Sequence, residues 1–195
     1  LPINGKPGLE FILDECKNAG IKEVILIISN KKKIIKDYFY NDNFFRKIIK
    51  IKKKNKEIKA AYNKIKKYKK MIKFVYQNKP LGTGDAVMKC KKYITSKYFL
   101  MLLPDDLIVK KNCSAEMIKL HKKYKSSVIA CKKVKKKDVS RWGIFKVKKK
   151  INRDFYIDDV IEKPSVKNAP SNLAVIGRYI LPTKIFKILK NQKVG

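Results

Sequence analysis

The sequence predicts a three-layer α/β domain with a mixed sheet, because two patterns alternate along the chain. Short apolar runs rich in β-branched residues are typical of strands covered on both faces. Between them, apolar residues recur every three or four positions, as in amphipathic helices. With 195 residues, 45% of them hydrophobic, the chain can bury a sizeable core. It contains no repeat or linker that would divide it, so we expect one domain over 1–195.

The first 76 residues predict two helices and two strands. Leu9, Ile12, Leu13 and Cys16 recur at helical spacing, and Gly20 provides a stop. A β-branched apolar run follows, which gives the helix-to-strand unit typical of α/β sheets. We expect helices over 7–19 and 30–40 and strands over 23–29 and 71–76.

A lysine-rich segment at about 41–70 interrupts this alternation. It is dominated by Lys, Ile and Asn, and one predicted apolar face contains Phe44, Phe45, Ile48 and Ile49. We interpret the segment as a mostly helical, solvated excursion whose charge run forms a surface face.

The remaining residues predict five strands and three helices. Ser114 is expected to cap one helix, and Pro182 is expected to open the last one. We expect helices over 85–93, 114–124 and from 182 onward, and strands over 98–103, 127–132, 142–147, 156–161 and 173–181.

The net charge of +34 would fit a nucleic-acid-binding protein, because clustered cations displace the counterions of phosphates. Three observations argue against this interpretation. Only four of the 50 basic residues are arginine, the side chain that most often reads base edges, and the lysines run through every segment. The uncharged remainder is rich in Ile, Asn, Tyr and Phe, which share A/T-rich codons with Lys. We therefore attribute the lysines to genome base composition and expect no specific nucleic-acid partner.

Cysteine and histidine usage predicts neither a disulfide framework nor a zinc site. Cys16, Cys90, Cys113 and Cys131 lack zinc-type spacing, so we expect four reduced thiols. His121 has no ligand-spaced companion. No apolar run approaches the ~18 residues of a membrane span, and the first residues show no secretory pattern. We expect a cytoplasmic protein with no membrane partner.

Two acidic residues follow Pro104, just past the strand predicted over 98–103. Asp105 and Asp106 would therefore lie at the carboxyl end of a strand, where open α/β sheets bind ligands. A carboxylate there can hold Mg²⁺, which takes its other ligands from waters and phosphates. The sequence Pro104-Asp105-Asp106 is also good turn chemistry, so the local sequence leaves both interpretations open.

A polar, glycine-bearing loop follows the strand predicted over 71–76. Gln77 can both donate and accept hydrogen bonds, as the edge of a pyrimidine requires. Gly82 and Gly84 would let the backbone approach a ligand at a helix N-terminus, which favours anions. An ordinary loop and helix start would have the same composition.

Two further segments combine strand ends with polar groups. Glu162 could accept sugar hydroxyls and Lys163 could neutralise a phosphate, with a surface ion pair as the alternative. In the block 169–179, Gly177 would allow a close backbone approach, with a structural hairpin as the alternative.

In their order along the chain, these segments resemble the bacterial UTP–glucose-1-phosphate uridylyltransferases over essentially the whole sequence. Thymidylyl transferases resemble it less, because they tend to carry Leu-Gly-Asp-Asn in place of Leu-Pro-Asp-Asp. The resemblance implies a Rossmann-like αβα nucleotidyl transferase fold with a mixed, mostly parallel sheet. The segments that carry it include Gln77…Leu81-Gly82-Thr83-Gly84-Asp85-Ala86, Leu103-Pro104-Asp105-Asp106, Trp142-Gly143, Glu162-Lys163-Pro164 and Ala169-Pro170-Ser171-Asn172-Leu173-Ala174-Val175-Ile176-Gly177-Arg178-Tyr179.

The resemblance also implies a reaction and a set of roles. An oxygen of glucose 1-phosphate would attack the α-phosphorus of UTP, with Mg²⁺ as cofactor, and pyrophosphate would leave. Such chemistry depends on positioning and charge neutralisation. The implied nucleotide site comprises Gln77, Gly82 and Thr83, the implied sugar site comprises Asp106, Gly143, Glu162 and Val175, and the implied catalytic residues are Lys163, beside the sugar phosphate, and Asp105, as a Mg²⁺ ligand.

The family pattern extends beyond both ends of this chain. Its glycine-rich phosphate loop would precede Leu1, and a helical tail would follow Gly195. The chain also begins without a methionine, so we expect a truncated domain from a longer protein that is a homodimer or homotetramer when complete. We expect these residues alone to be inactive. The alternatives are thymidylyl transfer, an inactive fragment, or a basic nucleic-acid-binding protein.

Overall fold

Helices and strands alternate along the chain in the computed structural model, which describes residues 2–3, 6–41, 43, 47, 50–51 and 55–192. This confirms the predicted α/β class. The chain divides into two compact units, and the expectation of one domain over 1–195 stays a prediction. The apolar face predicted at Phe44, Phe45, Ile48 and Ile49 lies outside the described residues. The first unit comprises Leu1–Glu15 and Leu100–Leu181, and the second comprises Cys16–Phe99 and Pro182–Gly195.

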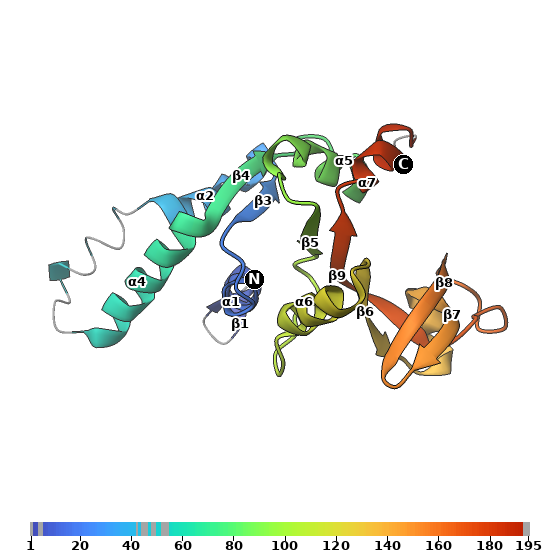
Figure 1. Ribbon diagram of the computed structural model, residues 1–195. Helices are drawn as coiled ribbons and strands as arrows, with labels where there is room; N and C mark the ends of the chain where they lie inside the picture. Colours follow the sequence, from blue (N-terminus) through green and yellow to red (C-terminus); the bar gives the residue numbers. More distant parts are fainter. Residues whose placement is uncertain are drawn as a thin grey trace. The chain divides into compact units, whose positions relative to one another are not determined.

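The second unit contains a parallel pair of strands, and helices α2 (Lys33–Tyr40) and α4 (Lys56–Met71) lie between them in sequence. β3 (Val24–Ile28) pairs with β4 (Ile72–Tyr76), so the ends of the two strands lie side by side. Helix α2 packs against α4 (Figure 1). Tyr62, Ile65 and Tyr68 recur at helical spacing and are buried, which leaves most lysines of α4 on the solvated face.

Two short helices complete this unit. α5 (Gly82–Lys89) packs against α7 (Ile185–Lys190), and the rings of Phe99 and Phe186 stack with centroids 5.6 Å apart. The prediction that Pro182 opens the last helix is wrong. Pro182 is the last residue of strand β9, and the N–H of the following Thr183 donates to Lys97 O at 2.9 Å.

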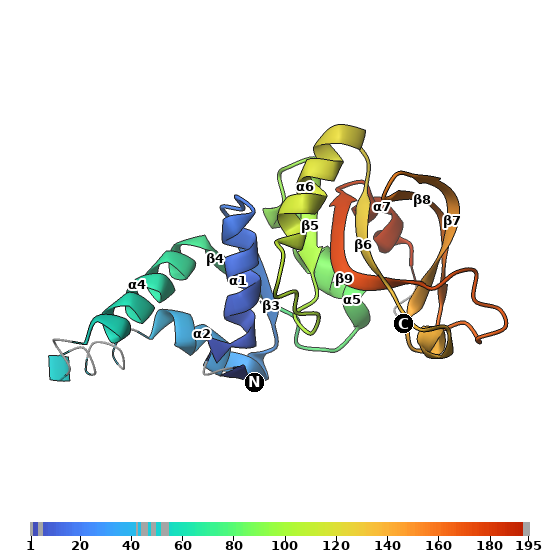
Figure 2. The same cartoon turned by 90° about the horizontal axis from the view of Figure 1, so that it is seen from below.

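The first unit is built on antiparallel ladders. β7 (Gly143–Ile151) and β8 (Asp154–Glu162) form a hairpin that continues onto β9 (Leu173–Pro182), and β6 (Val128–Lys133) pairs with β9 (Figure 2). β5 (Tyr98–Leu102) neighbours β9 in the same sheet. The parallel β3–β4 pair belongs to a separate sheet, so both strand orientations occur in the described residues but in two sheets instead of the one mixed, mostly parallel sheet that was expected.

Helices α1 (Gly8–Asn18) and α6 (Cys113–Tyr124) carry Glu15 and Ser114, which hydrogen-bond to each other. The prediction that Ser114 caps α6 is wrong. Asn112 is the cap, because its side chain accepts from the N–H of Ala115 at 2.8 Å. Ser114 is buried and bonds to Glu15 of α1 instead.

None of the helices in the described ranges is both long and apolar enough to cross a membrane.

The other described elements are short. The remaining elements are β1 (Pro2–Ile3), β2 (Lys6–Pro7) and the 3-10 helices η1 (Asn30–Lys32), η2 (Lys91–Tyr93) and η3 (Lys136–Arg141).

Candidate functional site

The turn after β5 carries the two predicted acidic site residues, and Arg178 of β9 holds its backbone. Arg178 Nη1 donates to Leu103 O at 3.0 Å, and Nη2 donates to Asp106 O at 2.7 Å. Asp105 lies between these two fixed carbonyls and is exposed at the carboxyl end of β5. Its carboxylate therefore projects from a turn whose backbone is fixed on both sides.

Arg178 is fully buried and forms an ion pair with Glu15 of α1. The Nη2–Oε2 distance is 2.9 Å, and Nε donates to both carboxylate oxygens at 3.2 Å. The N–H of Ser114 donates to Glu15 Oε1 at 3.1 Å. A buried charge is stable only when it is paired and hydrogen-bonded. Helix α1, helix α6, strand β9 and the acidic turn are thus connected through one buried network.

Gly177 makes the close approach that the sequence predicts. Its N–H donates to Asp106 Oδ2 at 2.7 Å. A Cβ at this position would lie 2.5 Å from the Cβ of Leu103 and 2.9 Å from Asp106 Oδ2. Strand β9 can therefore contact the acidic turn only because position 177 has no side chain.

Substituting Gly177 by alanine should destabilise the protein by roughly 1–3 kcal/mol, the usual cost of overpacking a well-packed contact. The measurement is the free energy of unfolding in urea. Gly143→Ala is the matched control in the same unit, because its Cβ would meet the movable end of Glu162 at 3.0 Å. Equal losses of stability in the two variants would contradict the argument.

Three of the predicted sugar-site residues converge around one backbone position. Gly143 pairs with Glu162 across the β7–β8 ladder, and the neighbouring Ile144–Ala174 pair brings Val175 alongside. A Cβ at Gly143 would lie 3.0 Å from Glu162 Oε2 and 3.5 Å from Val175 Cγ2. A side chain at position 143 would crowd Glu162, so glycine lets Glu162 and Val175 lie close to the backbone of β7.

Lys163 follows Glu162 at the end of β8 in the left-handed backbone region, with φ of 47°. Its N–H donates to Trp142 O at 3.0 Å, which fixes the backbone beside Gly143. Its Nζ lies 3.9 Å from Glu162 Oε1, and both side chains are mostly exposed. So long and exposed an ion pair is weak. The ammonium group is therefore available to a phosphate.

The carboxylates of this unit act on one common neighbour, Tyr179. Burial raises the pKa of Tyr179, and the charges of Asp106, Glu162 and Asp105 raise it further. The three acidic side chains are therefore all near enough to the Tyr179 hydroxyl to disfavour its ionised form.

In the second unit, the predicted nucleotide-site residues lie where β4 passes into α5. The N–H of Gln77 extends the ladder by donating to Ile28 O at 2.9 Å. Its side-chain Nε2 donates to Gly82 O at 3.0 Å and to Asp85 Oδ2 at 2.8 Å. The loop expected before Asp85 is shorter than predicted, since α5 begins at Gly82. Gly82 and Thr83 are exposed in its first turn.

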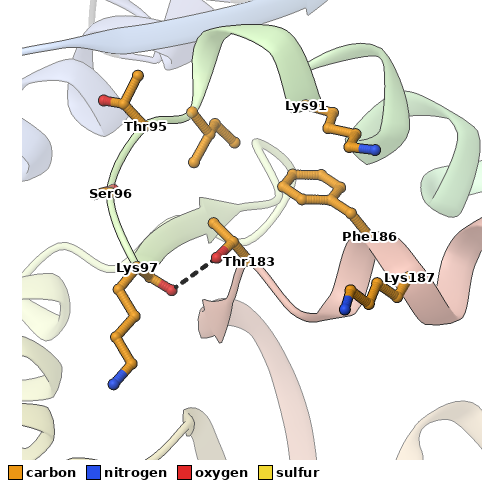
Figure 3. Close-up of a pocket in the computed structure, with 8 residues that line it drawn as sticks. Lys91, Thr95, Ser96, Lys97, Thr183, Phe186 and Lys187 are labelled. Carbon is orange, nitrogen blue, oxygen red and sulfur yellow. Dashed lines mark hydrogen bonds between the residues drawn. The ribbon is translucent and has the colours of Figure 1, made fainter.

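Two surface cavities, one in each unit, are lined by residues other than the predicted ones. The cavity in the second unit has a volume of about 500 Å³ and lies between the η2–β5 connection and α7 (Figure 3). Thr183 Oγ1 donates to Lys97 O across it at 3.2 Å. The other, in the first unit, has a volume of about 390 Å³ and is lined by residues of β6, η3 and Trp142. Neither contains a carboxylate turn or a glycine-bearing loop.

The cysteines do not supply a nucleophile. None of the four forms a disulfide, as the sequence predicts. Burial raises the pKa of Cys90 and of Cys113 to about 11, so both thiols stay protonated at neutral pH. A reaction at this site would depend on positioning and charge.

The structure adds Arg178, Glu15 and Asp85 to the residues predicted from sequence. A sequence signal exists for Arg178, because it is a single charge inside the apolar strand β9. Glu15 is adjacent in sequence to the buried Cys16, and no sequence pattern distinguishes it from an ordinary helix residue. Asp85 could be recognised only as an acidic residue in a first helical turn.

Comparison with known proteins finds relatives that match the whole chain. A curated UTP–glucose-1-phosphate uridylyltransferase of Streptococcus pyogenes is 34% identical over the whole chain, which spans 65% of that relative's length. A solved UDP-glucose pyrophosphorylase from Acinetobacter baumannii is 31% identical with a TM-score of 0.89, over all of this chain and 70% of that one. A UDP-glucose pyrophosphorylase solved in complex with UDP-glucose is 30% identical with a TM-score of 0.83, over all of this chain and 71% of that one.

The family profile described as nucleotidyl transferase matches residues 1–194. The match covers the acidic turn, the glycine-bearing start of α5 and the Gly143–Glu162–Val175 group. These similarities confirm the αβα fold class and show that the chain belongs to the nucleotidyl transferase family.

Proposed function

We propose that the protein containing this chain transfers a uridylyl group from UTP to glucose 1-phosphate, forming UDP-glucose and pyrophosphate. The names of its relatives and structural neighbours support this proposal. The observation that carries it is the convergence of Gly143, Glu162 and Val175 beside Lys163. That group combines a hydroxyl acceptor, an apolar contact and a phosphate-binding cation within a few residues.

Each side chain in the sugar region has a distinct task in this proposal. Glu162 accepts hydrogen bonds from glucose hydroxyls, and the missing side chain at Gly143 lets the sugar approach the backbone of β7. Lys163 neutralises the sugar phosphate as a point charge, so that an oxygen can approach the α-phosphorus. Asp106 stays bound to the N–H of Gly177, which positions the acidic turn beside the sugar.

The residues present fit one Mg²⁺ ion held by Asp105. This carboxylate is exposed on a turn whose backbone Arg178 fixes on both sides. In the part of the chain that the structure describes, no group of three or more His, Cys, Asp or Glu could hold a metal. Mg²⁺ commonly takes one or two carboxylates and completes its shell with waters and phosphates. A bound ion would neutralise charge on the phosphates during transfer.

In the second unit, Gln77 and the backbone at Gly82 hold the uracil, with Thr83 beside it. Both Gly82 and Thr83 are exposed at the first turn of α5, where a helix N-terminus favours anionic groups. The proposal includes a cytoplasmic homo-oligomer with no specific nucleic-acid or membrane partner.

The proposal is tested by pyrophosphate release from UTP and glucose 1-phosphate in the presence of Mg²⁺, with identification of the sugar nucleotide. Parallel reactions with dTTP separate uridylyl from thymidylyl transfer. Higher kcat/KM with dTTP than with UTP would assign the thymidylyl alternative. Absence of turnover with every nucleotide in the natural full-length protein would contradict the proposal.

Gly143→Ala should raise the KM for glucose 1-phosphate by roughly tenfold or more, because a methyl group would occupy the space meant for the sugar. The KM for UTP should change little. Steady-state kinetics with each substrate varied in turn measures both values. If the KM for glucose 1-phosphate is unchanged, the sugar does not bind at this position.

A further inference from the structure

The side-chain amide of Gln77 has only one orientation that its surroundings allow. Its nitrogen faces two acceptors, the carbonyl of Gly82 at 3.0 Å and the carboxylate of Asp85 at 2.8 Å. Carboxylate and carbonyl oxygens only accept hydrogen bonds. A flipped amide would place its own oxygen against both of them and would lose both bonds. The carbonyl Oε1 of Gln77 is therefore the group left to face a ligand.

This orientation determines which base edge the side chain can meet. Uracil presents a donor at N3–H, which pairs with an acceptor such as Gln77 Oε1. Cytosine presents an unprotonated N3, which is an acceptor and would be repelled. A polar site rejects a ligand of the wrong hydrogen-bonding pattern strongly when its own groups cannot reorient.

Asp85 is itself held in place. It lies in the first turn of α5, where the helix dipole favours a carboxylate, and Lys89 Nζ lies 3.6 Å from its Oδ1. The oxygen that accepts from Gln77 is the other one, Oδ2. One carboxylate oxygen thus faces lysine while the other fixes the amide.

We propose that Asp85 is a specificity-determining positioning residue that locks the Gln77 amide with its oxygen towards the base, so that uracil is accepted and cytosine is rejected. The inference rests on the proposed function, because it takes Gln77 as the base contact. Asp85 acts through Gln77 and does not touch the nucleotide.

The test is Asp85→Asn in the natural full-length protein, with UTP and CTP affinities measured by calorimetric titration in Mg²⁺ buffer. An asparagine can either accept from or donate to the amide, so a flipped Gln77 loses less than it does beside a carboxylate. We expect UTP affinity to stay nearly constant and CTP affinity to rise by about tenfold. A change of about tenfold corresponds to the free energy that one hydrogen bond to a charged group contributes. Damage to the fold would weaken both nucleotides and could not produce this gain.

Lys89→Met is the matched control, since it removes the other partner of Asp85 and leaves the carboxylate in place. Its ratio of UTP to CTP affinity should equal that of the wild type. An unchanged ratio in Asp85→Asn, or a wild-type protein that binds CTP as well as UTP, would overturn the inference. Calorimetry measures binding and does not require UDP-glucose formation. A protein that binds UTP more tightly than CTP but forms no UDP-glucose would therefore refute the proposed function without refuting this inference.

Discussion

Arg178→Met should lower the free energy of unfolding by about 3–5 kcal/mol, the usual cost of removing one partner of a buried ion pair. The side chain is 0% exposed, and all of its nitrogens donate to Glu15 or to backbone carbonyls. Methionine fills a similar volume but leaves the Glu15 carboxylate buried without its counter-charge. The carbonyls of Leu103 and Asp106 would lose their donor as well. Urea denaturation followed by circular dichroism measures the change.

A second ion pair of equal length provides the control. Lys146 Nζ lies 2.9 Å from Asp158 Oδ2, the same distance as Arg178 Nη2 from Glu15 Oε2, but both of its side chains are about half exposed. Lys146→Met should leave the denaturation midpoint unchanged within error, because water screens the exposed pair. If both substitutions have the same effect, burial is not what gives the Arg178 pair its importance.

Combining Arg178→Met with Glu15→Leu tests the same argument from the other partner. The double variant no longer contains an uncompensated buried charge, so it should be more stable than Arg178→Met alone. Additive losses would show instead that the contacts to the acidic turn dominate. Arg178→Lys should remain destabilised despite its charge, since an ammonium group cannot reproduce the planar fork of donors.

Spacing along the sequence predicted most elements, because burial on one face leaves a local pattern. The strand expected over 173–181 is β9 (Leu173–Pro182), and the helix expected over 7–19 is α1 (Gly8–Asn18). The cap of α6 illustrates the limit. Asn112 and Ser114 are both good capping residues. The choice depends on Glu15, which binds Ser114 across 99 residues of sequence.

The same limit applies to the candidate site. The family resemblance implied Gly143, Glu162 and Val175 as parts of one sugar site, whereas no local pattern in the sequence places them together. The β7–β8 and β7–β9 registers explain why they lie side by side. The Arg178–Glu15 pair joins positions 163 residues apart, and no local pattern encodes such a partnership. The Gln77–Asp85 bond spans eight residues, but its consequence for base choice follows from which atom donates.

Asp105→Asn should reduce kcat by roughly 10²- to 10³-fold, the range seen when a group that stabilises developing charge is removed. Asparagine keeps the shape of the side chain but loses the charge that would hold Mg²⁺. The Mg²⁺ concentration that gives half the maximal rate should rise as well. Rates of pyrophosphate release over a range of Mg²⁺ concentrations measure both effects.

Asp158→Asn makes the same chemical change in the same unit, on an exposed side chain paired with Lys146. It should keep the wild-type rate and Mg²⁺ dependence, so a general effect of lost negative charge on this strongly basic chain can be separated from loss of a ligand. Unfolding measurements should show that Asp105→Asn is as stable as the wild type, because position 105 is exposed. A wild-type rate in Asp105→Asn would show that the metal assignment is wrong.

Arg178→Met and Asp105→Asn should impair different properties of the protein. Arg178→Met disturbs the backbone on both sides of Asp105, so it should lower stability and also impair turnover. Asp105→Asn leaves Arg178, Leu103 O and Asp106 O as they are, so it should impair turnover alone. Buried Arg178 stabilises the backbone of the turn and so fixes the position of the exposed Asp105 carboxylate. Such a fixed position is expected where the placement of a charge determines the rate. Loss of stability in Asp105→Asn comparable to that in Arg178→Met would contradict this division of roles.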